Sequence, residues 1–394
     1  MSRIPTMRGL EGLDIICMSP NYWNSTCQVA QQIMKFLAHQ NRVLFVEPPV
    51  ASFPFKYPER WKKWVDWLGE VKKIERNLFR VTAPPVLPFK GRSLKINNFS
   101  QRIVERWVKK QARQLHFENS ILWIFLPNYF ELVGKLGESF TIYHILDEFT
   151  AVPWYRQNVI SKMEERLLSQ ADLVITCSPQ VYENKKYKCR NIINISNGVD
   201  FELFVKAAND ISAIPPEFGD IPKPIIGFIG VLDFRIDFLL LKQLAKELPD
   251  YSFVFVGPAR VDISSLKKLK NFHFLGFKSH LLIPQYVNAF NVCLIPYQLN
   301  NFVLGISPLK LFEYFSLGKP VVAPDIPAIR VADGLTYLSH NQKEFIQNVK
   351  VAVKEDDPLL RKKRIELAAE NSWKKKIEII SSKLAEILYR KKNK

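Results

Sequence analysis

The chain has 394 residues, of which 47% are hydrophobic and 24% are charged, and its formal net charge is +18. This length predicts two domains of roughly 200 residues each, and the composition is that of a globular rather than a disordered protein. No run reaches the ~18 consecutive apolar residues of a membrane-spanning helix. The five cysteines are scattered and indicate neither a disulfide framework nor a zinc site. We therefore expect a cytoplasmic protein that holds no metal.

The positive charge is concentrated at the two ends of the chain. Residues 1–115 hold 20 Lys/Arg against 8 Asp/Glu, and residues 361–394 hold 12 against 4, so the middle is nearly neutral. An anionic membrane surface, an anionic substrate or a nucleic acid would each explain this pattern, and a merely soluble basic surface is the alternative. Because no known nucleic-acid-binding motif accompanies the charges, we expect no nucleic acid partner.

The first half of the chain reads as alternating strands and helices. Apolar runs predict strands at 13–17, 42–46, 120–126, 140–146 and 173–177, and helical spacing predicts helices at 27–39 and 158–170. Strands that alternate with helices indicate a parallel sheet covered on both faces.

A second series of strands and helices follows a segment rich in Pro, Asp and Asn, which is the best linker candidate. Strands are predicted at 224–229, 251–256, 272–275, 291–295 and 320–323, and helices at 237–247 and 309–317. The expected domains are 1–205 and 224–370, with a linker at 206–223 and a basic helix at 371–394. The fold class is α/β, with two Rossmann-like domains facing one another across a cleft.

Two features of the second half point to a phosphate ligand. Gly230 ends an apolar strand, where a glycine lets a diphosphate approach backbone N–H groups, although a tight turn without a ligand explains it equally well. Ser307 and Pro308 are a natural N-cap and first residue of a helix. Lys310 and Glu313 lie three residues apart near its start, where a cation can meet a phosphate and a carboxylate can accept both hydroxyls of a ribose. An ordinary ion pair is the alternative.

Paired carboxylates end a strand in the first half. Asp147 and Glu148 follow the run 142–146, and ligands of open α/β sheets bind beyond the carboxyl ends of strands. Asp147 could accept a proton from an attacking hydroxyl, with Glu148 as the less favoured neighbour, or either residue could cap the following turn. Three further residues follow the first strand and could contact an acceptor or pack in the interior: Asn21, Trp23 and Ser25.

The basic, aromatic segment 53–80 has apolar residues at helical spacing. Trp61 and Trp64 fall on one predicted helical face, with Lys62 and Lys63 beside them. This composition is typical of a helix lying at a membrane interface, and a helix packed on its own domain shows a similar stripe.

The segment 308–322, together with 290–297, 227–230 and 271–276, resembles the nucleotide-sugar half of GT-B glycosyltransferases of the large bacterial group, which is family 4/1-like. The segments 171–178 and 197–200 extend the resemblance over most of the chain. The similarity is greatest to the transferases that make cell-surface polysaccharides, of the teichuronic-acid type and the xanthan glucuronosyl type.

This resemblance implies a sugar transfer from a nucleotide diphosphate sugar, most simply a UDP-sugar, to a saccharide acceptor that is lipid-linked. Glu313 would bind the ribose, Lys310 the phosphates and the Gly230 loop the diphosphate. The other residues expected on the donor side are Arg235, Tyr297, Ser307 and Pro308. No cofactor or metal is required, and the protein would work as a peripheral protein at the inner face of the cell membrane.

The sequence departs from the retaining members of the family. Gly305 stands where they carry a second glutamate, Val231 stands where they carry an arginine, and residues 121–128 contain no histidine. The absence of this histidine favours an inverting displacement with Asp147 as the base. A retaining transferase, a nucleotide-sugar epimerase of the same fold and a non-catalytic membrane adaptor are the alternatives. In this family the last helix crosses back onto the N-terminal domain, which would place both basic ends on the acceptor side, as membrane docking requires.

Overall fold

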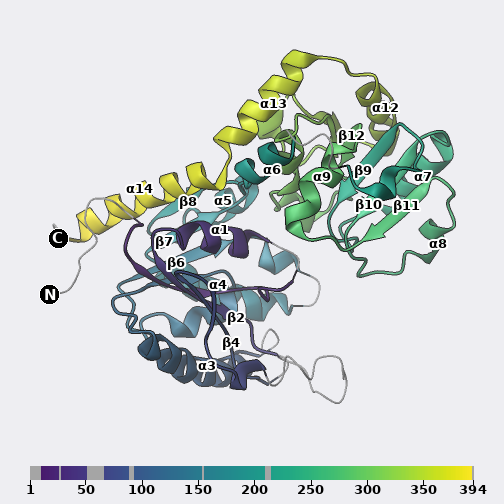
Figure 1. Ribbon diagram of the computed structural model, residues 1–394. Coiled ribbons are helices and arrows are strands. Elements are labelled where there is room, and N and C mark those ends of the chain that lie inside the picture. The colour runs from purple at the N-terminus through teal and green to yellow at the C-terminus, as the bar shows by residue number, and fades with distance from the viewer. Residues whose placement is uncertain are drawn as a thin grey trace. The chain divides into compact units, whose positions relative to one another are not determined.

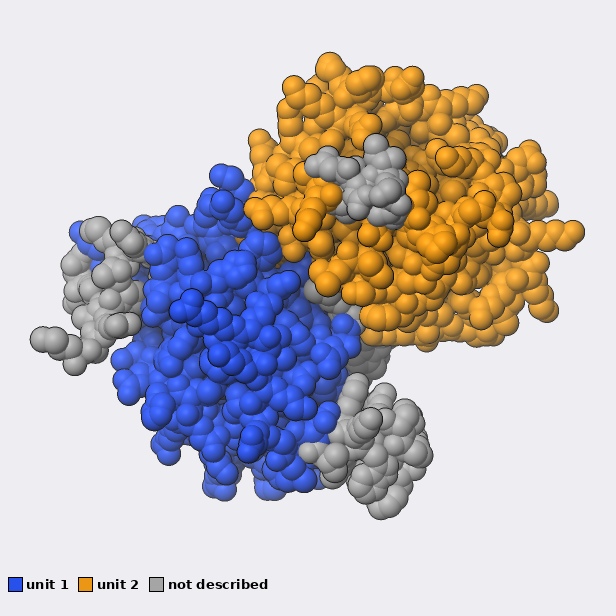
Figure 2. Space-filling model, viewed as in Figure 1, with its two compact units in different colours: residues 1–195, 374–394 blue, residues 196–373 orange. Residues whose placement is uncertain are grey.

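The computed structural model describes residues 10–25, 28–50, 66–87, 93–152, 155–208 and 214–392. The chain forms two compact units, one of residues 1–195 and 374–394 and the other of residues 196–373 (Figure 2). The second unit thus begins before the boundary expected at residue 205. The reason is that α6 (Phe201–Ala208) packs on α9 (Ile283–Asn288) and buries Phe204 in the core of the second unit.

The first unit is built on an eight-stranded sheet (Figure 1). Its strands are β1 (Asp14–Met18), β2 (Arg42–Glu47), β3 (Lys72–Glu75), β4 (Leu78–Thr82), β5 (Ile121–Ile124), β6 (Phe140–Ile145), β7 (Leu173–Thr176) and β8 (Ile192–Asn194). Its helices, 3₁₀ turns included, are α1 (Val29–Leu37), η3 (Asp66–Leu68), α3 (Leu94–Gln114), η4 (Pro127–Leu132), η5 (Phe149–Ala151), α4 (Gln157–Gln170) and α5 (Pro179–Lys185). The strand order is β3-β4-β2-β1-β5-β6-β7-β8, and only β3 runs antiparallel to its neighbour.

The structure confirms the strands predicted for this unit. They occupy the middle of the sheet. All residues of β5, β6 and β7 are buried, so these strands are continuous apolar runs rather than alternating ones. Parallel pairing aligns the carboxyl ends of β1, β2, β5 and β6 along one edge. The segments that follow these strands, among them 19–25 and 146–148, are therefore carried by one edge of a rigid sheet.

The helix predicted over 53–80 is wrong for the part of it that the structure describes. From Lys72 onward the chain forms β3 and β4, and β4 extends the sheet by parallel pairing with β2. Leu78 and Val81 are buried in this pairing, whereas Leu68 is 68% exposed. The pairing of β4 with the edge of the sheet therefore determines the conformation here, and the helical spacing of the apolar residues does not. Trp61, Lys62, Lys63 and Trp64 lie outside the described residues.

The second unit holds a six-stranded parallel sheet of order β11-β10-β9-β12-β13-β14 (Figure 1). Its strands are β9 (Ile225–Ile229), β10 (Ser252–Val256), β11 (Phe272–Gly276), β12 (Val292–Leu294), β13 (Val321–Pro324) and β14 (Tyr337–Ser339). Besides α6 and α9, its helices and 3₁₀ turns are η7 (Pro216–Phe218), α7 (Phe238–Glu247), α8 (Ser264–Lys267), η8 (His280–Leu282), α10 (Asn301–Leu304), α11 (Lys310–Phe315), η9 (Arg330–Ala332), α12 (Gln342–Val353) and α13 (Pro358–Glu370). The central strand β9 lies between β10 and β12, and its end carries Gly230.

The last helix returns to the first unit. α14 (Trp373–Lys392) belongs to that unit from Lys374 onward, and Ser381 Oγ accepts a 2.8 Å hydrogen bond from the Leu10 backbone N–H. Farther along the helix, Lys391 forms an ion pair with Asp172. No helix in the described part of the chain is long and apolar enough to cross a membrane.

Candidate active site

Two glycines bring the ends of β9 and β10 into contact. Gly230 has φ +138° and donates its N–H to Val256 O at 2.8 Å, and Gly257 has φ +143°. A Cβ on Gly257 would lie 2.1 Å from the carbonyl oxygen of Gly230. Both the positive φ and the close approach require glycine. The backbone at the carboxyl end of β9 is therefore bare, as a phosphate-binding loop needs.

Lys310 lies directly against this bare turn. Its Nζ would be 3.3 Å from a Cβ on Gly230, and it donates a 2.5 Å hydrogen bond to the Tyr297 hydroxyl. The ammonium also lies 4.8 Å from the ring centroid of Phe228 and 4.7 Å from that of Tyr297. Two aromatic faces thus hold a half-buried cation beside the glycine.

A second cation completes the cluster. Arg235 donates two hydrogen bonds to Asp233, of 2.9 and 2.7 Å, and its guanidinium carbon lies 5.6 Å from the centroid of the Tyr297 ring. Burial raises the pKa of Tyr297, but the charges of Lys310 and Arg235 outweigh burial and lower that pKa overall. With one carboxylate against two cations, the cluster around Gly230 has a positive charge in excess, which suits an anionic ligand.

Glu313 lies on α11, the helix that begins with Lys310. It is 9% exposed, and its Oε1 lies 3.5 Å from Nε2 of His280, which is held edge-on to the ring of Phe204. The next residue, Tyr314, accepts a 2.9 Å hydrogen bond from the backbone N–H of Ile229. α11, which carries Lys310 and Glu313, is therefore tied to the end of β9, which leads into Gly230. The sequence reading missed His280, because 33 residues separate it from Glu313.

Ser307 and Pro308 lie before α11, but they do not begin the helix as predicted. The helix begins at Lys310 with Leu309 as its N-cap, so the prediction that Ser307 is the N-cap is wrong. Instead, Ser307 Oγ accepts a 3.3 Å hydrogen bond from the Asn197 backbone N–H, and Ser307 O accepts a 2.6 Å bond from Asn197 Nδ2. This contact between segments 110 residues apart fixes the entry to α11. Asn197 therefore positions the start of α11, and the sequence analysis did not include it among the site residues.

In the first unit, Asp147 follows β6 and is half-buried. Burial raises the pKa of Tyr155, and the nearby negative charge of Asp147 raises it further. Glu148 is the N-cap residue of η5 but makes no side-chain cap hydrogen bond, so the capping alternative does not describe it.

Glu148 is part of a buried ionic network. Lys185 Nζ lies 3.0 Å from Glu148 Oε1 and 2.6 Å from Glu164 Oε2, and Tyr143 donates a 3.1 Å hydrogen bond to Glu164. Burial raises the pKa of Glu148, but Lys185 and the Thr150 hydroxyl outweigh it and lower that pKa overall. The Glu148 carboxylate is therefore occupied by Lys185 and Thr150, and these contacts stabilise the 146–151 turn, which also carries Asp147.

The one histidine close to Asp147 in sequence does not compete as a base. His144 lies on β6, is 2% exposed and stacks on Phe125 at 5.2 Å. Burial lowers its pKa to about 3. Its Nε2 lies 3.3 Å from the Sγ of Cys177, which is also buried. This histidine is a neutral core side chain.

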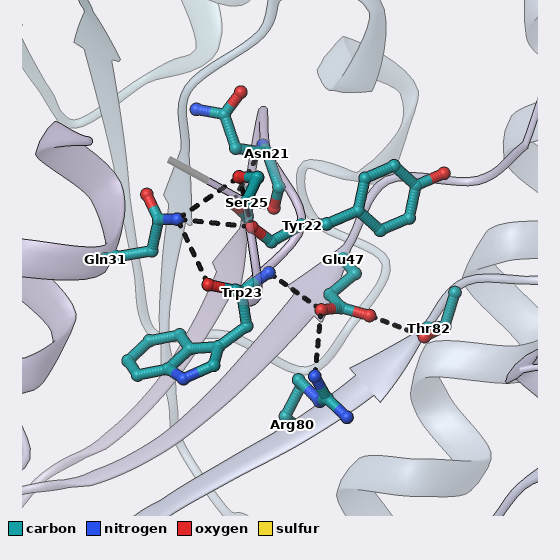
Figure 3. A network of polar contacts seen from close by, with 9 residues as sticks. Asn21, Tyr22, Trp23, Ser25, Gln31, Glu47, Arg80 and Thr82 are labelled. Atoms are coloured by element: carbon teal, nitrogen blue, oxygen red, sulfur yellow. Dashed lines mark hydrogen bonds and ion pairs between the residues drawn. The ribbon is translucent and has the colours of Figure 1, made fainter. Parts of the chain in front are cut away.

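The expected acceptor-side loop after β1 is fixed by hydrogen bonds (Figure 3). Trp23 is half-buried, packs edge-on to Phe45 at 5.0 Å and donates its backbone N–H to Glu47 Oε1 at 2.8 Å. Ser25 Oγ donates to Tyr22 O at 2.6 Å. Asn21 Nδ2 donates to Gln28 Oε1 at 2.5 Å. The three expected residues are thus brought together in one rigid loop.

Glu47 anchors this loop to the sheet. It is 4% exposed at the end of β2, where Thr82 donates a 2.6 Å hydrogen bond to its Oε2 and Arg80 lies 3.6 Å from its Oε1 (Figure 3). Gln31 supports the loop from α1, because its Nε2 donates to the carbonyl oxygens of Tyr22 and Trp23 at 3.2 and 3.4 Å. Within the described residues, no group of three or more His, Cys, Asp or Glu side chains could hold a metal ion.

Comparison with known proteins agrees with this geometry. Residues 223–355 match the family model described as glycosyl transferases group 1, a range that includes Gly230, Lys310 and Glu313. A protein of Bacillus subtilis (strain 168) named as a teichuronic acid biosynthesis glycosyltransferase, TuaH, is 29% identical over 229 residues, which are 54% of this chain. The match spans 57% of that relative's length.

Solved structures share the architecture over nearly the whole chain. Sucrose-phosphate synthase from Thermosynechococcus elongatus has a TM-score of 0.69 at 15% identity, covering 97% of this chain and 99% of that one. The trehalose-6-phosphate enzyme of E. coli bound with UDP-2-fluoro glucose has a TM-score of 0.65 at 11% identity, covering 94% and 99%. These likenesses confirm the expected fold. The chain has the GT-B fold, and its residues 223–355 match the group 1 glycosyltransferase family model.

Proposed function

We propose that this protein is a glycosyltransferase that moves a sugar from a nucleotide diphosphate sugar to a saccharide acceptor in cell-surface polysaccharide synthesis. The group 1 domain and the similarity to a teichuronic acid transferase support this activity. A UDP-sugar is the donor that we propose, since one solved structure of the same fold is bound with UDP-2-fluoro glucose.

The observation that carries the proposal is the juxtaposition of Lys310 with the bare turn at Gly230. The ammonium and the backbone N–H groups of this turn are suited to a diphosphate, whose negative charge increases when the sugar leaves. Glu313, one turn along α11, would accept the ribose hydroxyls. Tyr297 accepts a hydrogen bond from Lys310, and the guanidinium of Arg235 lies over the Tyr297 ring.

Two further residues are assigned to the donor side through the contact that fixes the start of α11. Ser307 is hydrogen-bonded to Asn197, and Pro308 follows it directly before Leu309, the N-cap of α11. We expect their backbone, rather than their side chains, to set the position of Lys310. Substitution of either residue should therefore act on donor affinity through Lys310.

We assign Asp147 as the base of an inverting displacement. In this step the acceptor hydroxyl oxygen attacks the anomeric carbon and its proton passes to the Asp147 carboxylate. The bond from the anomeric carbon to the diphosphate breaks, and the nucleoside diphosphate leaves with the electron pair. The neutral, buried state of His144 and the commitment of Glu148 to Lys185 favour Asp147 among its neighbours.

The acceptor side is assigned to the rigid loop with Asn21, Trp23 and Ser25. Glu47 and Gln31 hold this loop without any ligand, so little conformational entropy would be lost on binding. The relative's role in teichuronic acid synthesis suggests a lipid-linked saccharide as the acceptor, reached at the inner face of the membrane.

The test begins with calorimetry of the full chain against nucleoside diphosphates and their sugars. A UDP-sugar should bind without acceptor, and the sugar should be transferred only when a saccharide acceptor is added. Conversion of the donor alone to its epimer would instead identify an epimerase. NMR of the product's anomeric centre should show the inverted configuration. Binding of no nucleotide sugar would refute the proposal.

A further inference from the structure

The exposed face of α3 is the most strongly charged helical surface that the described residues leave without ion pairs. It carries five cations and no acid: Lys95, Arg102, Arg106, Lys110 and Arg113. At 100° per residue these five side chains and Phe99 fall within an arc of about 80°. No ion pair engages any of the five among the described residues.

Two apolar side chains lie on the same face. Phe99 is 56% exposed and Ile103 is 37% exposed, although both are of the type that proteins normally bury. The opposite side of α3, with Val104 and Val108 at 0% exposure, packs in the unit's core. The helix lies along the outer side of its unit (Figure 1), and the side chains of this face are exposed.

We propose that the exposed face of α3 docks the protein on an anionic lipid bilayer. The five cations extend over about 27 Å of helix, at 1.5 Å per residue, which matches a flat anionic surface. Phe99 and Ile103 would enter the headgroup region between them. No known nucleic-acid-binding motif accompanies these charges, and exposed apolar side chains between cations are the composition of a helix at a membrane interface, so we favour lipid over nucleic acid. Only one part of this inference rests on the proposed function, namely that docking gives the enzyme access to a lipid-linked acceptor.

The acidic residue of α3 supports the assignment. Glu105 lies on the flank of α3 and is paired with Lys109 at 2.7 Å, so it neutralises a neighbour outside the five rather than the docking face itself. Docking thus falls on an element different from the segment 53–80 that the sequence analysis favoured.

Flotation of the full chain with vesicles tests the inference. Wild type should float at low salt with vesicles of phosphatidylcholine containing 30% phosphatidylglycerol and should not float with pure phosphatidylcholine. The variant R102Q/R106Q/K110Q should lose about 100-fold in partitioning, because each cation near an anionic surface contributes about fivefold. The variant F99S/I103S should lose about tenfold and keep its salt dependence.

A matched control removes three exposed lysines from the other unit. K242Q/K246Q/K268Q makes the same change in net charge on α7 and after α8, and it should partition within about threefold of wild type. Circular dichroism should show all variants folded, since every changed side chain is exposed.

Three results would overturn the inference: no flotation of wild type, undiminished flotation of the α3 variant, or an equal loss in the control. Duplex DNA is tested at the same salt, and tighter binding to DNA that depends on α3 would assign the face to nucleic acid instead. Donor binding by calorimetry is measured on every variant. Loss of flotation with intact donor binding supports docking by α3, whereas absent donor binding in wild type refutes the proposed function alone.

Discussion

Substitution of Gly257 by alanine tests whether the contact between β10 and the Gly230 turn shapes the donor site. The new Cβ would lie 2.1 Å from Gly230 O and 2.7 Å from Gly230 C, so the Gly230 peptide must move. Gly276 is the matched control, because it also has a positive φ, of +67°, but nothing lies within 4 Å of its Cβ position.

The structure sets the expected magnitudes. Gly276→Ala should cost about 1–2 kcal/mol of stability, from the left-handed backbone alone. Gly257→Ala should cost at least ~2 kcal/mol more, because the overlap is with backbone and no rotamer can relieve it. For a unit of this size that difference lowers the melting temperature by about 4–8 °C relative to the control.

The assay combines thermal unfolding with calorimetry of donor binding at a temperature where both variants are folded. Gly257→Ala should also weaken donor binding by about tenfold or more, which is 1.4 kcal/mol, because the displaced atoms belong to the proposed diphosphate loop. Gly276→Ala should leave affinity unchanged. Equal stability and equal affinity of the two variants would refute the reasoning.

Three further predictions concern the first unit. Lys185→Met should destabilise the protein by about 3–5 kcal/mol, because it leaves the Glu148 and Glu164 carboxylates buried without their cation. Lys188→Met is the exposed control, and a similar loss there in thermal unfolding would contradict this account. The pKa of Glu148 is lowered from its ordinary value of 4.5, so its contribution to stability is present above pH 4.5 and is lost as the pH falls through the folded-state pKa. Glu148→Gln should therefore flatten the acid limb of stability against pH, and an unchanged limb would argue against the pairing. Asp147→Asn should lower kcat by about 10²–10⁴-fold with unchanged donor affinity, whereas near-normal turnover would remove its role as base.

The positions of most strands along the chain could be predicted because these strands pair in parallel and are buried on both faces. Strands such as β6 and β9 are buried along their whole length and therefore appear as uninterrupted apolar runs. The same logic failed at β4, where burial is interrupted at Phe79 and Arg80 and the preceding tryptophans suggested a helix.

The chemistry of the donor site could be predicted only in part. Lys310 and Glu313 are neighbours on one helix, so their spacing revealed them. The contacts of Asn197 with Ser307 and of His280 with Glu313 join segments far apart in the chain. Only the fold brings such pairs together, and no local spacing predicts them.

The most direct test of the account is calorimetric binding of a UDP-sugar to wild type, Lys310→Ala and Lys246→Ala. Lys310 lies against the Gly230 turn, whereas Lys246 is an exposed lysine on α7 of the same unit. Loss of a charge-assisted hydrogen bond of about 1.5–3 kcal/mol should weaken donor binding by roughly 10- to 150-fold in Lys310→Ala, with no change in Lys246→Ala. Equal donor affinity in all three proteins would contradict the assignment of this site to the nucleotide diphosphate.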